Sequence, residues 1–298
     1  MRIFGAVVGL VVVSSSLVAG GPPGEALQLA RSRRGLPVVV LHAGLQTLRL
    51  GLDTGTSRTL VSAEAATRLR LKPNQRLSIG SAGGGSRDGY CGAAPVLHLH
   101  GIPFVPDCLG WLPDEVRLGG AEDLDGLLGA DLLSQVDLWI DPTRTPVLAR
   151  IAPPGMLQSW IDGDRLSVQS IGRRPAIAGH LASLRWNSST IRLIIDSGAN
   201  GLVLFGEVAR RTAEASALER MHGTLESVIS RQKVAIVPVS AFHAGESQFS
   251  VPWAGLLPHV GDRIEDGVIS LDAFGPVLFD LSNNMIIANA RFRSSPRK

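Results

Sequence analysis

Apolar and polar positions alternate along two stretches of the chain, and each stretch ends in an aspartate. Leucine occupies every second position from 48 to 52 before Asp53, and isoleucine or leucine does so from 191 to 195 before Asp196. A period of two residues is typical of a β-strand with one buried face. The pattern therefore places each aspartate at the end of a strand, on the face opposite the apolar row.

The two stretches belong to an internal repeat, which bears on the whole fold. Each copy has a strand, a turn, a second strand that ends in Asp-(Thr/Ser)-Gly, a helix-like stretch and, later, an apolar segment followed by a strand. The matching segments are 36–57 with 174–200, 63–69 with 206–212, 125–133 with 266–274, and 136–141 with 277–280. The register is nearly constant, since 143 residues separate Asp53 from Asp196 and 141 separate Asp131 from Asp272.

Composition agrees with two compact units rich in β-sheet. The chain has 298 residues, 45% of them hydrophobic and 18% charged, which allows two domains with buried cores. Aromatic residues make up only 5%, and the abundance of aliphatic residues and glycine suits sheets with tight turns.

The formal charge of +3 does not point to a nucleic-acid partner. Proteins that bind nucleic acids concentrate lysine and arginine on one face. Here arginine is scattered, apart from short clusters at 31–34, at 173–174 and in the tail. We therefore expect no nucleic-acid binding.

The first residues resemble a secretory signal peptide. Arg2 precedes an apolar run over 3–13, and Val18 and Gly20 fit the positions before a cleavage site. We expect residues 1–20 to be a signal peptide and the protein to be exported, to a bacterial-type periplasm or outside the cell. The alternative is an uncleaved segment that anchors the protein to the inner membrane, and only then would a membrane be a partner.

Two cysteines, Cys91 and Cys108, flank a predicted turn at His100-Gly101. A hairpin with that turn would bring them near one another, so a disulfide is possible in an oxidising compartment. Two buried thiols are the other interpretation, and the sequence does not separate them. His98 and His100 are too few ligands for a metal ion, and we expect no metal.

The repeated signatures resemble those of a known family. Asp53–Ser57 is similar to the pepsin-type turn, and Asp196–Ala199 to the retroviral type, which has alanine after the glycine. Leu127–Leu133 resembles the hydrophobic-hydrophobic-Gly segment of that family and the helix after it. The chain thus resembles the pepsin/retropepsin superfamily of aspartic peptidases over residues 36–150 and 174–290, as two retropepsin-like halves in one polypeptide.

The resemblance implies an all-β, bilobal acid-protease fold with short helices and a cleft between two barrel-like lobes. The expected parts are a signal peptide at 1–20, an N-terminal lobe at 28–150, a linker at 151–172 and a C-terminal lobe at 173–293. One position departs from the family pattern: Ser270 stands where the second half should have glycine. Glycine there suits a close crossing of two backbone segments beneath the active-site loop.

The resemblance makes Asp53 and Asp196 the catalytic pair. Two adjacent carboxylates share one proton, so one can act as a base on water while the other polarises the scissile carbonyl. Thr56 has a hydroxyl to offer Asp53, whereas Ala199 has none for Asp196, so we expect Asp53 to be the ionised member. The residues that support the pair are Thr54 and Ser197, which resemble the paired bridging hydroxyls of the family, with Gly55, Thr56 and Gly198.

A glycine-rich stretch, Ile79–Tyr90, fits the hairpin that covers the cleft in this family. Gly84 and Gly85 lie near its tip and Tyr90 near its base, and these three are weaker candidates for substrate binding. The second half should have its hairpin within 221–240. The sequence therefore predicts a monomeric aspartic endopeptidase that acts on peptides or proteins without a cofactor. The alternative is a non-catalytic peptide-binding protein on the same scaffold.

Overall fold

The computed structural model describes residues 21–80, 84–113, 123–182, 190–215, 221–226, 231–260 and 263–297. The expected signal segment, 1–20, lies outside them. Strands dominate these ranges, and the sheets curl, so the predicted all-β class with short helices is confirmed.

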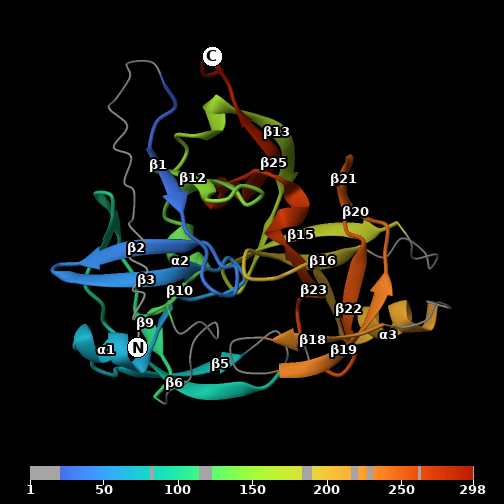
Figure 1. The fold of residues 1–298 in the computed structure, drawn as a ribbon, viewed down its shortest axis with the longest axis horizontal. Coiled ribbons are helices and arrows are strands. Elements are labelled where there is room, and N and C mark those ends of the chain that lie inside the picture. The colour runs from blue at the N-terminus through green and yellow to red at the C-terminus, as the bar shows by residue number, and fades with distance from the viewer. Residues whose placement is uncertain are drawn as a thin grey trace, which may run out of the picture.

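The strands form three sheets (Figure 1). The six-stranded sheet has the order β1 (Glu25–Leu29), β12 (Val147–Ala152), β11 (Asp137–Asp141), β24 (Val277–Asp280), β25 (Met285–Phe292) and β13 (Ile161–Ser167). The nine-stranded sheet has the order β5 (Gln75–Gly80), β6 (Ser86–Gly92), β9 (Leu109–Trp111), β4 (Leu60–Val61), β10 (Gly126–Leu128), β3 (Gln46–Leu52), β2 (Val38–Ala43), β7 (Leu97–Leu99) and β8 (Ile102–Phe104).

The ten-stranded sheet belongs to the second half of the chain. Its order is β18 (Met221–Glu226), β19 (Arg231–Pro238), β22 (Trp253–Leu257), β17 (Leu202–Phe205), β23 (Gly267–Ser270), β16 (Ile191–Asp196), β15 (Arg174–Leu181), β20 (Ala241–Ala244) and β21 (Ser247–Ser250), and β14 (Gln169–Ile171) pairs with β15. The helices are α1 (Ala63–Arg68), α2 (Ala130–Leu133) and α3 (Gly206–Ala215), with 3-10 turns η2 (Gln158–Trp160), η3 (Leu271–Phe274) and η4 (Leu281–Asn283).

The two larger sheets follow the same path, so the sequence repeat is also a structural one. Each strand of the nine-stranded sheet has a counterpart at the same place in the order of the ten-stranded sheet. The first strands, β5 and β18, correspond to each other, and so do the last strands, β8 and β21. In each, the strand that ends at the aspartate pairs in parallel with a later strand, β3 with β10 and β16 with β23. The two helix-like stretches are α1 and α3, as the sequence predicts.

Glycines at equivalent positions allow β10 and β23 to lie close to their antiparallel neighbours, β4 and β17. A Cβ on Gly126 would lie 2.0 Å from the carbonyl oxygen of Leu60, and one on Gly267 would lie 2.3 Å from that of Val203. A side chain cannot fit at such distances. Both copies therefore need glycine at the position that faces the antiparallel neighbour, β4 in the first copy and β17 in the second. The apolar rows that lead to the two aspartates are buried beside these crossings.

The six-stranded sheet joins the halves. β11 from the first half pairs antiparallel with β24 from the second, with Leu138 opposite Phe279. The predicted connection, 151–172, contributes the end of β12, then η2, β13 and β14. Across the described ranges, no helix has the length and apolar character that a membrane crossing requires.

Candidate active site

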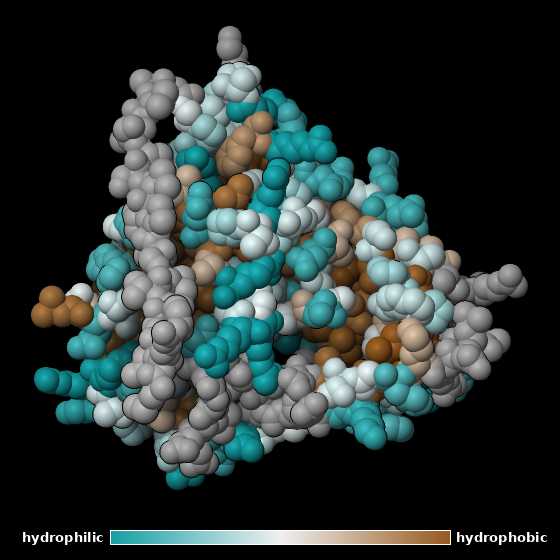
Figure 2. Space-filling model, viewed as in Figure 1, coloured by the Kyte–Doolittle hydropathy of each residue, from teal (hydrophilic) through white to brown (hydrophobic). Residues whose placement is uncertain are grey.

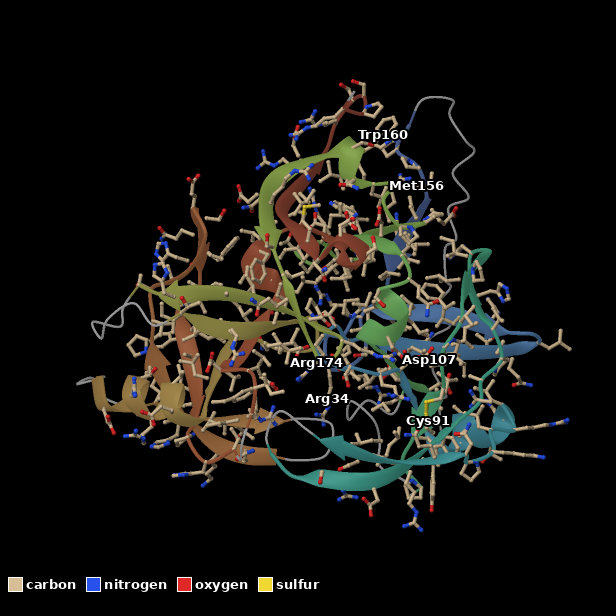
Figure 3. The ribbon with its side chains drawn as sticks, turned by 180° about the vertical axis from the view of Figure 1, so that it is seen from behind. Arg34, Cys91, Asp107, Met156, Trp160 and Arg174 are labelled. Carbon is tan, nitrogen blue, oxygen red and sulfur yellow. A yellow bond between two sulfur atoms is a disulfide. The ribbon has the colours of Figure 1, made fainter. Side chains whose placement is uncertain are left out.

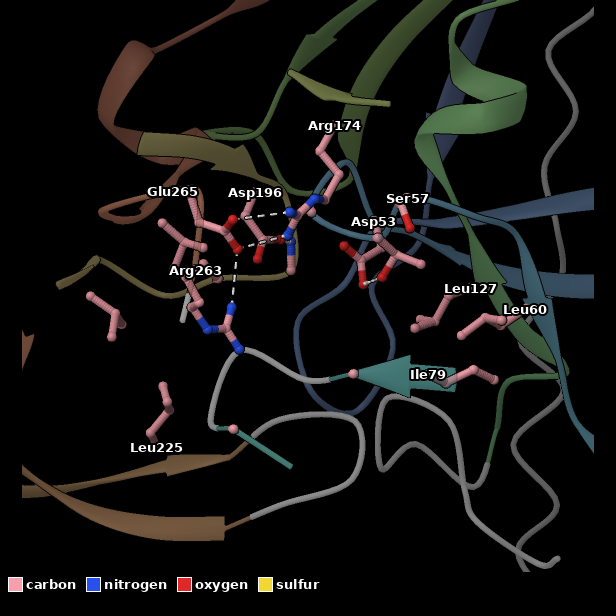
Figure 4. Close-up of a pocket in the computed structure, with 18 of the residues that line it drawn as sticks. Asp53, Ser57, Leu60, Ile79, Leu127, Arg174, Asp196, Leu225, Arg263 and Glu265 are labelled. Carbon is pink, nitrogen blue, oxygen red and sulfur yellow. Dashed lines mark hydrogen bonds and ion pairs between the residues drawn. The ribbon is translucent and has the colours of Figure 1, made fainter. Parts of the chain in front are cut away.

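Asp53 and Asp196, the two aspartates of the repeat, meet between the two larger sheets (Figure 4). Asp53 directly follows β3, and its backbone N–H donates to the carbonyl oxygen of Leu128 on β10 at 3.0 Å. Asp196 ends β16. An added Cβ on Gly198 would lie 3.1 Å from Asp196 Oδ1 and 3.4 Å from Asp53 Cγ, so the two carboxyl groups are adjacent. Residues 143 positions apart thus form one site, as the repeat predicts.

Thr54 and Ser197 link the two turns through four hydrogen bonds. The Thr54 N–H donates to Ser197 Oγ, and the Ser197 N–H donates to Thr54 Oγ1, both at 3.0 Å. The Thr54 hydroxyl then donates to the carbonyl of Ile195 at 2.8 Å, and the Ser197 hydroxyl to that of Leu52 at 2.9 Å. This reciprocal pattern fixes the spacing of the aspartates that follow β3 and end β16.

The environments of the two carboxyl groups differ. Burial raises the pKa of Asp53, but the hydroxyl of Thr56, which donates to its Oδ2 at 2.8 Å, and the N–H of Gly55 work against that rise. Burial, together with the adjacent charge of Asp53, raises the pKa of Asp196 to about 8. The N–H of Gly198 donates to Asp196 Oδ1 at 2.7 Å. The asymmetry favours a shared proton that resides on Asp196.

Close packing, more than turn conformation, explains the signature glycines. Neither Gly55 nor Gly198 has a positive φ. A Cβ on Gly55 would instead lie 2.3 Å from Asp196 Cγ, and one on Gly198 would lie 3.1 Å from Asp196 Oδ1. A side chain at position 55 would therefore displace the carboxyl group of Asp196 or the turn, whereas one at position 198 would need only a small shift.

Ser270, the departure from the family pattern, lies against a segment whose backbone conformation differs between the two halves. In the first half, a Cβ on Gly129 would lie 2.5 Å from the backbone of Arg58. The repeat places Gly201, with φ +92°, at the counterpart of Arg58. The Ser270 N–H donates to the Gly201 carbonyl at 2.8 Å, and the Ser270 hydroxyl accepts from the N–H of Asp272 at 3.3 Å. Each crossing therefore has one glycine, on opposite strands.

A buried carboxylate supports the first turn. The backbone N–H and the hydroxyl of Thr59 both donate to Asp131 Oδ1 at 2.8 Å, and the Gly129 N–H donates to the Thr59 hydroxyl at 3.0 Å. Burial raises the pKa of Asp131, although the bonds from Thr59 oppose the rise. Its counterpart in the repeat, Asp272, is exposed. The first turn is thus held more firmly than the second.

A cavity of about 1120 Å³ surrounds the aspartates. It exceeds the ~300–1,000 Å³ typical of small-ligand pockets, which suits an extended ligand. Figure 2 shows the surface hollowed between the two larger sheets. Two hairpins border the cavity, β5–β6 from the first half and β18–β19 from the second, along one edge of the molecule (Figure 1).

The first hairpin carries the weaker candidates. Gly84 and Gly85 line the cavity, whereas Tyr90 packs on the ring of Trp111, with ring centroids 5.8 Å apart, and is not among the described residues that line it. The tip residues 81–83 lie outside the described ranges. The second hairpin lies within the predicted 221–240, and residues 227–230 are likewise not described.

Cys91 and Cys108 form a disulfide, with Cα atoms 5.8 Å apart (Figure 3). Of the two interpretations of the cysteines, the structure supports the bridge. The predicted turn is also present, since His100 and Gly101 connect β7 to β8 and both have positive φ. The bridge joins β6 to the segment before β9, at the base of the first hairpin.

A charged cluster in the cavity wall was not predicted from the sequence. Arg174, Arg263 and Glu265 line the cavity and bond to one another (Figure 4). The available signal was the repeat itself, in which Arg174-Pro175 stands where the first half has Leu36-Pro37. A charge in place of a buried leucine marks a difference between the two walls.

Comparisons with protein-family models and with curated protein sequences found no match.

Proposed function

We propose that this protein is an aspartic endopeptidase with two pepsin/retropepsin-like lobes, one built on each larger sheet. The observation that carries the proposal is the adjacent pair of Asp53 and Asp196, held by the reciprocal bonds of Thr54 and Ser197. Two carboxyl groups that share one proton supply both a base and an acid at one point. The volume of the cavity around them, about 1120 Å³, supports an extended peptide as the ligand.

In the proposed reaction, Asp53 takes a proton from water as the water oxygen attacks the peptide carbonyl carbon. Asp196 gives its proton to the carbonyl oxygen. In the second step, the C–N bond breaks, the departing nitrogen accepts the proton from Asp53, and Asp196 recovers a proton from the intermediate. The pair ends as it began, and no other group is consumed.

Export is part of the proposal. A disulfide is typical of oxidising compartments, and Cys91–Cys108 supports such a location. We propose that residues 1–20 direct a monomeric protein to the periplasm or outside the cell. The alternative is that residues 1–20 are not cleaved and anchor the protein in the inner membrane.

A peptide-library digest tests the proposed activity. The wild-type protein should release cleaved peptides, whereas Asp53→Asn and Asp196→Asn should each release almost none while remaining folded by circular dichroism. An amide cannot share the proton, so one substitution suffices. Substantial cleavage by either variant would sink the assignment. Peptides that are retained but never cut by the wild type would instead favour a peptide-binding protein on this scaffold.

The hydroxyl of Thr56 should set the acidic limb of the pH–rate profile. Thr56→Ala removes the bond to Asp53 Oδ2, which favours the charged carboxylate, so the acidic limb should move to higher pH. Ala199→Thr should lower one or both limbs by offering Asp196 a hydroxyl. We expect shifts of about 0.3–1 pH unit, the scale of one charge-assisted hydrogen bond. The limbs belong to the pair as a whole. An unmoved acidic limb in folded Thr56→Ala would contradict the assigned roles.

A further inference from the structure

The two walls of the cavity differ in polarity although the repeat makes them equivalent. In the first half, Leu36 precedes a proline and Leu124 precedes Asp-Gly; both line an apolar cluster that includes Leu60, Ile79 and Leu127. In the second half, the residues at the same two places are Arg174 and Glu265. An apolar pair on one wall is thus an ion pair on the other.

Glu265 is the centre of this cluster, with a side chain only 5% exposed. Its two oxygens accept from the two terminal nitrogens of Arg174 at 3.1 and 3.2 Å, and Oε1 also accepts from Arg263 at 3.0 Å. Burial works against the charge of Glu265, but the charge and hydrogen bonds of Arg174 hold its pKa below the usual value. The carboxylate therefore stays ionised at neutral pH and cancels one of the two guanidinium charges.

Two guanidinium groups share the one carboxylate of Glu265, and all three side chains line the cavity. Arg174 is 21% exposed and Arg263 20%, and the guanidinium of Arg263 lies 4.6 Å from the ring centroid of Phe205. Among the described residues, Arg174 uses three of its five N–H groups, one on the carbonyl of Ile171 and two on Glu265. The remaining two, one on each terminal nitrogen, lie on opposite edges of the guanidinium, and one of them can donate to a carboxylate in the cavity.

We propose that Arg174, positioned by Glu265, forms a subsite for an acidic side chain of the peptide, on the side of the cleft that contains Asp196. The substrate would then be asymmetric, with an apolar side chain against the leucine-rich first wall and aspartate or glutamate against the second. Arginine suits this role because its guanidinium keeps its charge and can hold Glu265 along one edge while it donates to a second carboxylate from another. The inference rests on the proposed peptide-cleaving function and adds a substrate preference to it.

The experiment compares wild type with a variant that copies the first wall, Arg174→Leu/Glu265→Leu. The double substitution is chosen because Arg174→Leu alone would leave a buried carboxylate with one partner fewer. Both proteins digest a synthetic peptide library, and the same library is passed over immobilised Asp196→Asn protein with and without the double substitution. Arg291→Leu, an exposed arginine on β25 outside the cavity, serves as the control for loss of a positive charge.

We expect aspartate or glutamate to be enriched at one fixed distance from the cut, and the double variant to lose that enrichment. For matched peptides with glutamate or glutamine at that position, the preference for glutamate in kcat/KM should fall about 10–100-fold, the contribution of a hydrogen bond to a charged group. Arg291→Leu should keep the wild-type profile.

The outcomes separate the two proposals. Cleavage without acidic enrichment, or with enrichment that survives the double substitution, would overturn the subsite and leave the peptidase in place. Absence of cleavage with acidic peptides captured, and lost on double substitution, would support the subsite in a binding protein and overturn the peptidase. Absence of both cleavage and acidic capture would overturn both.

Discussion

Asp196→Asn is expected to abolish turnover and, at neutral pH, to stabilise the fold. The loss of activity should be about 10²–10⁴-fold, the usual contribution of one positioned acid or base. The gain in stability has a separate cause, the cost of charging a buried carboxyl group next to Asp53. Where a catalytic group destabilises the folded state, its replacement should both lower the activity and raise the free energy of unfolding.

The pH dependence of that gain follows from the direction of the pKa shift. The pKa of Asp196 is raised to about 8 in the folded protein, whereas an aspartate in an unfolded chain titrates near ~3.9. Between these values the folded state retains a proton that the unfolded state has lost. The free energy of unfolding of the wild type therefore falls as pH rises through this window, by at most about 1.4 kcal/mol per pH unit.

Asparagine does not titrate, so the advantage of Asp196→Asn should be small near pH ~4, grow with pH and level off above pH ~8. Urea unfolding of both proteins across this range measures the difference. Asp272→Asn is the matched control, because Asp272 is an exposed aspartate near the same crossing. The prediction is wrong if the stabilities of Asp196→Asn and wild type run parallel with pH.

The parts of the site that the sequence predicted are those encoded locally. The alternation of apolar and polar residues before Asp53 and Asp196 predicts strands that end at a carboxylate. The repeat predicts that both copies have the same surroundings. The position of the first hairpin follows equally from neighbouring glycines. Such features need only a few consecutive residues, and the equivalence of the copies supplies the long-range contact.

Features that depend on two distant segments were not predictable in this way. Glycine was expected at Ser270, whereas the difference between the halves lies in the backbone of the segment beside it, where Gly201 has positive φ and accepts from the Ser270 N–H. The ion pair of Arg174 with Glu265 joins residues 91 positions apart, and neither residue has a local motif. Such long-range contacts are indicated by positions at which the two copies of the repeat differ, more than by positions at which they agree.

Gly55→Ala is expected to remove most activity without unfolding the protein. The backbone at Gly55 does not have positive φ, so alanine is compatible with its conformation. The added Cβ would lie 2.3 Å from Cγ of Asp196 and 2.4 Å from its Oδ2, far inside contact distance. The carboxyl group or the turn must move, and a displacement near 1 Å in a catalytic group can cost about 10²-fold in rate.

A graded series tests this steric cause. At Gly198 the nearest atoms to an added Cβ are 3.1–3.4 Å away, so Gly198→Ala should lower kcat/KM less than Gly55→Ala. Gly255→Ala on β22 is the control, because its Cβ would make only ordinary contacts at 3.7 Å or more. We expect the order Gly255→Ala, Gly198→Ala, Gly55→Ala in increasing loss, with unchanged circular dichroism spectra. Near-wild-type kcat/KM for Gly55→Ala would mean that the contact between this turn and Asp196 does not position the catalytic pair.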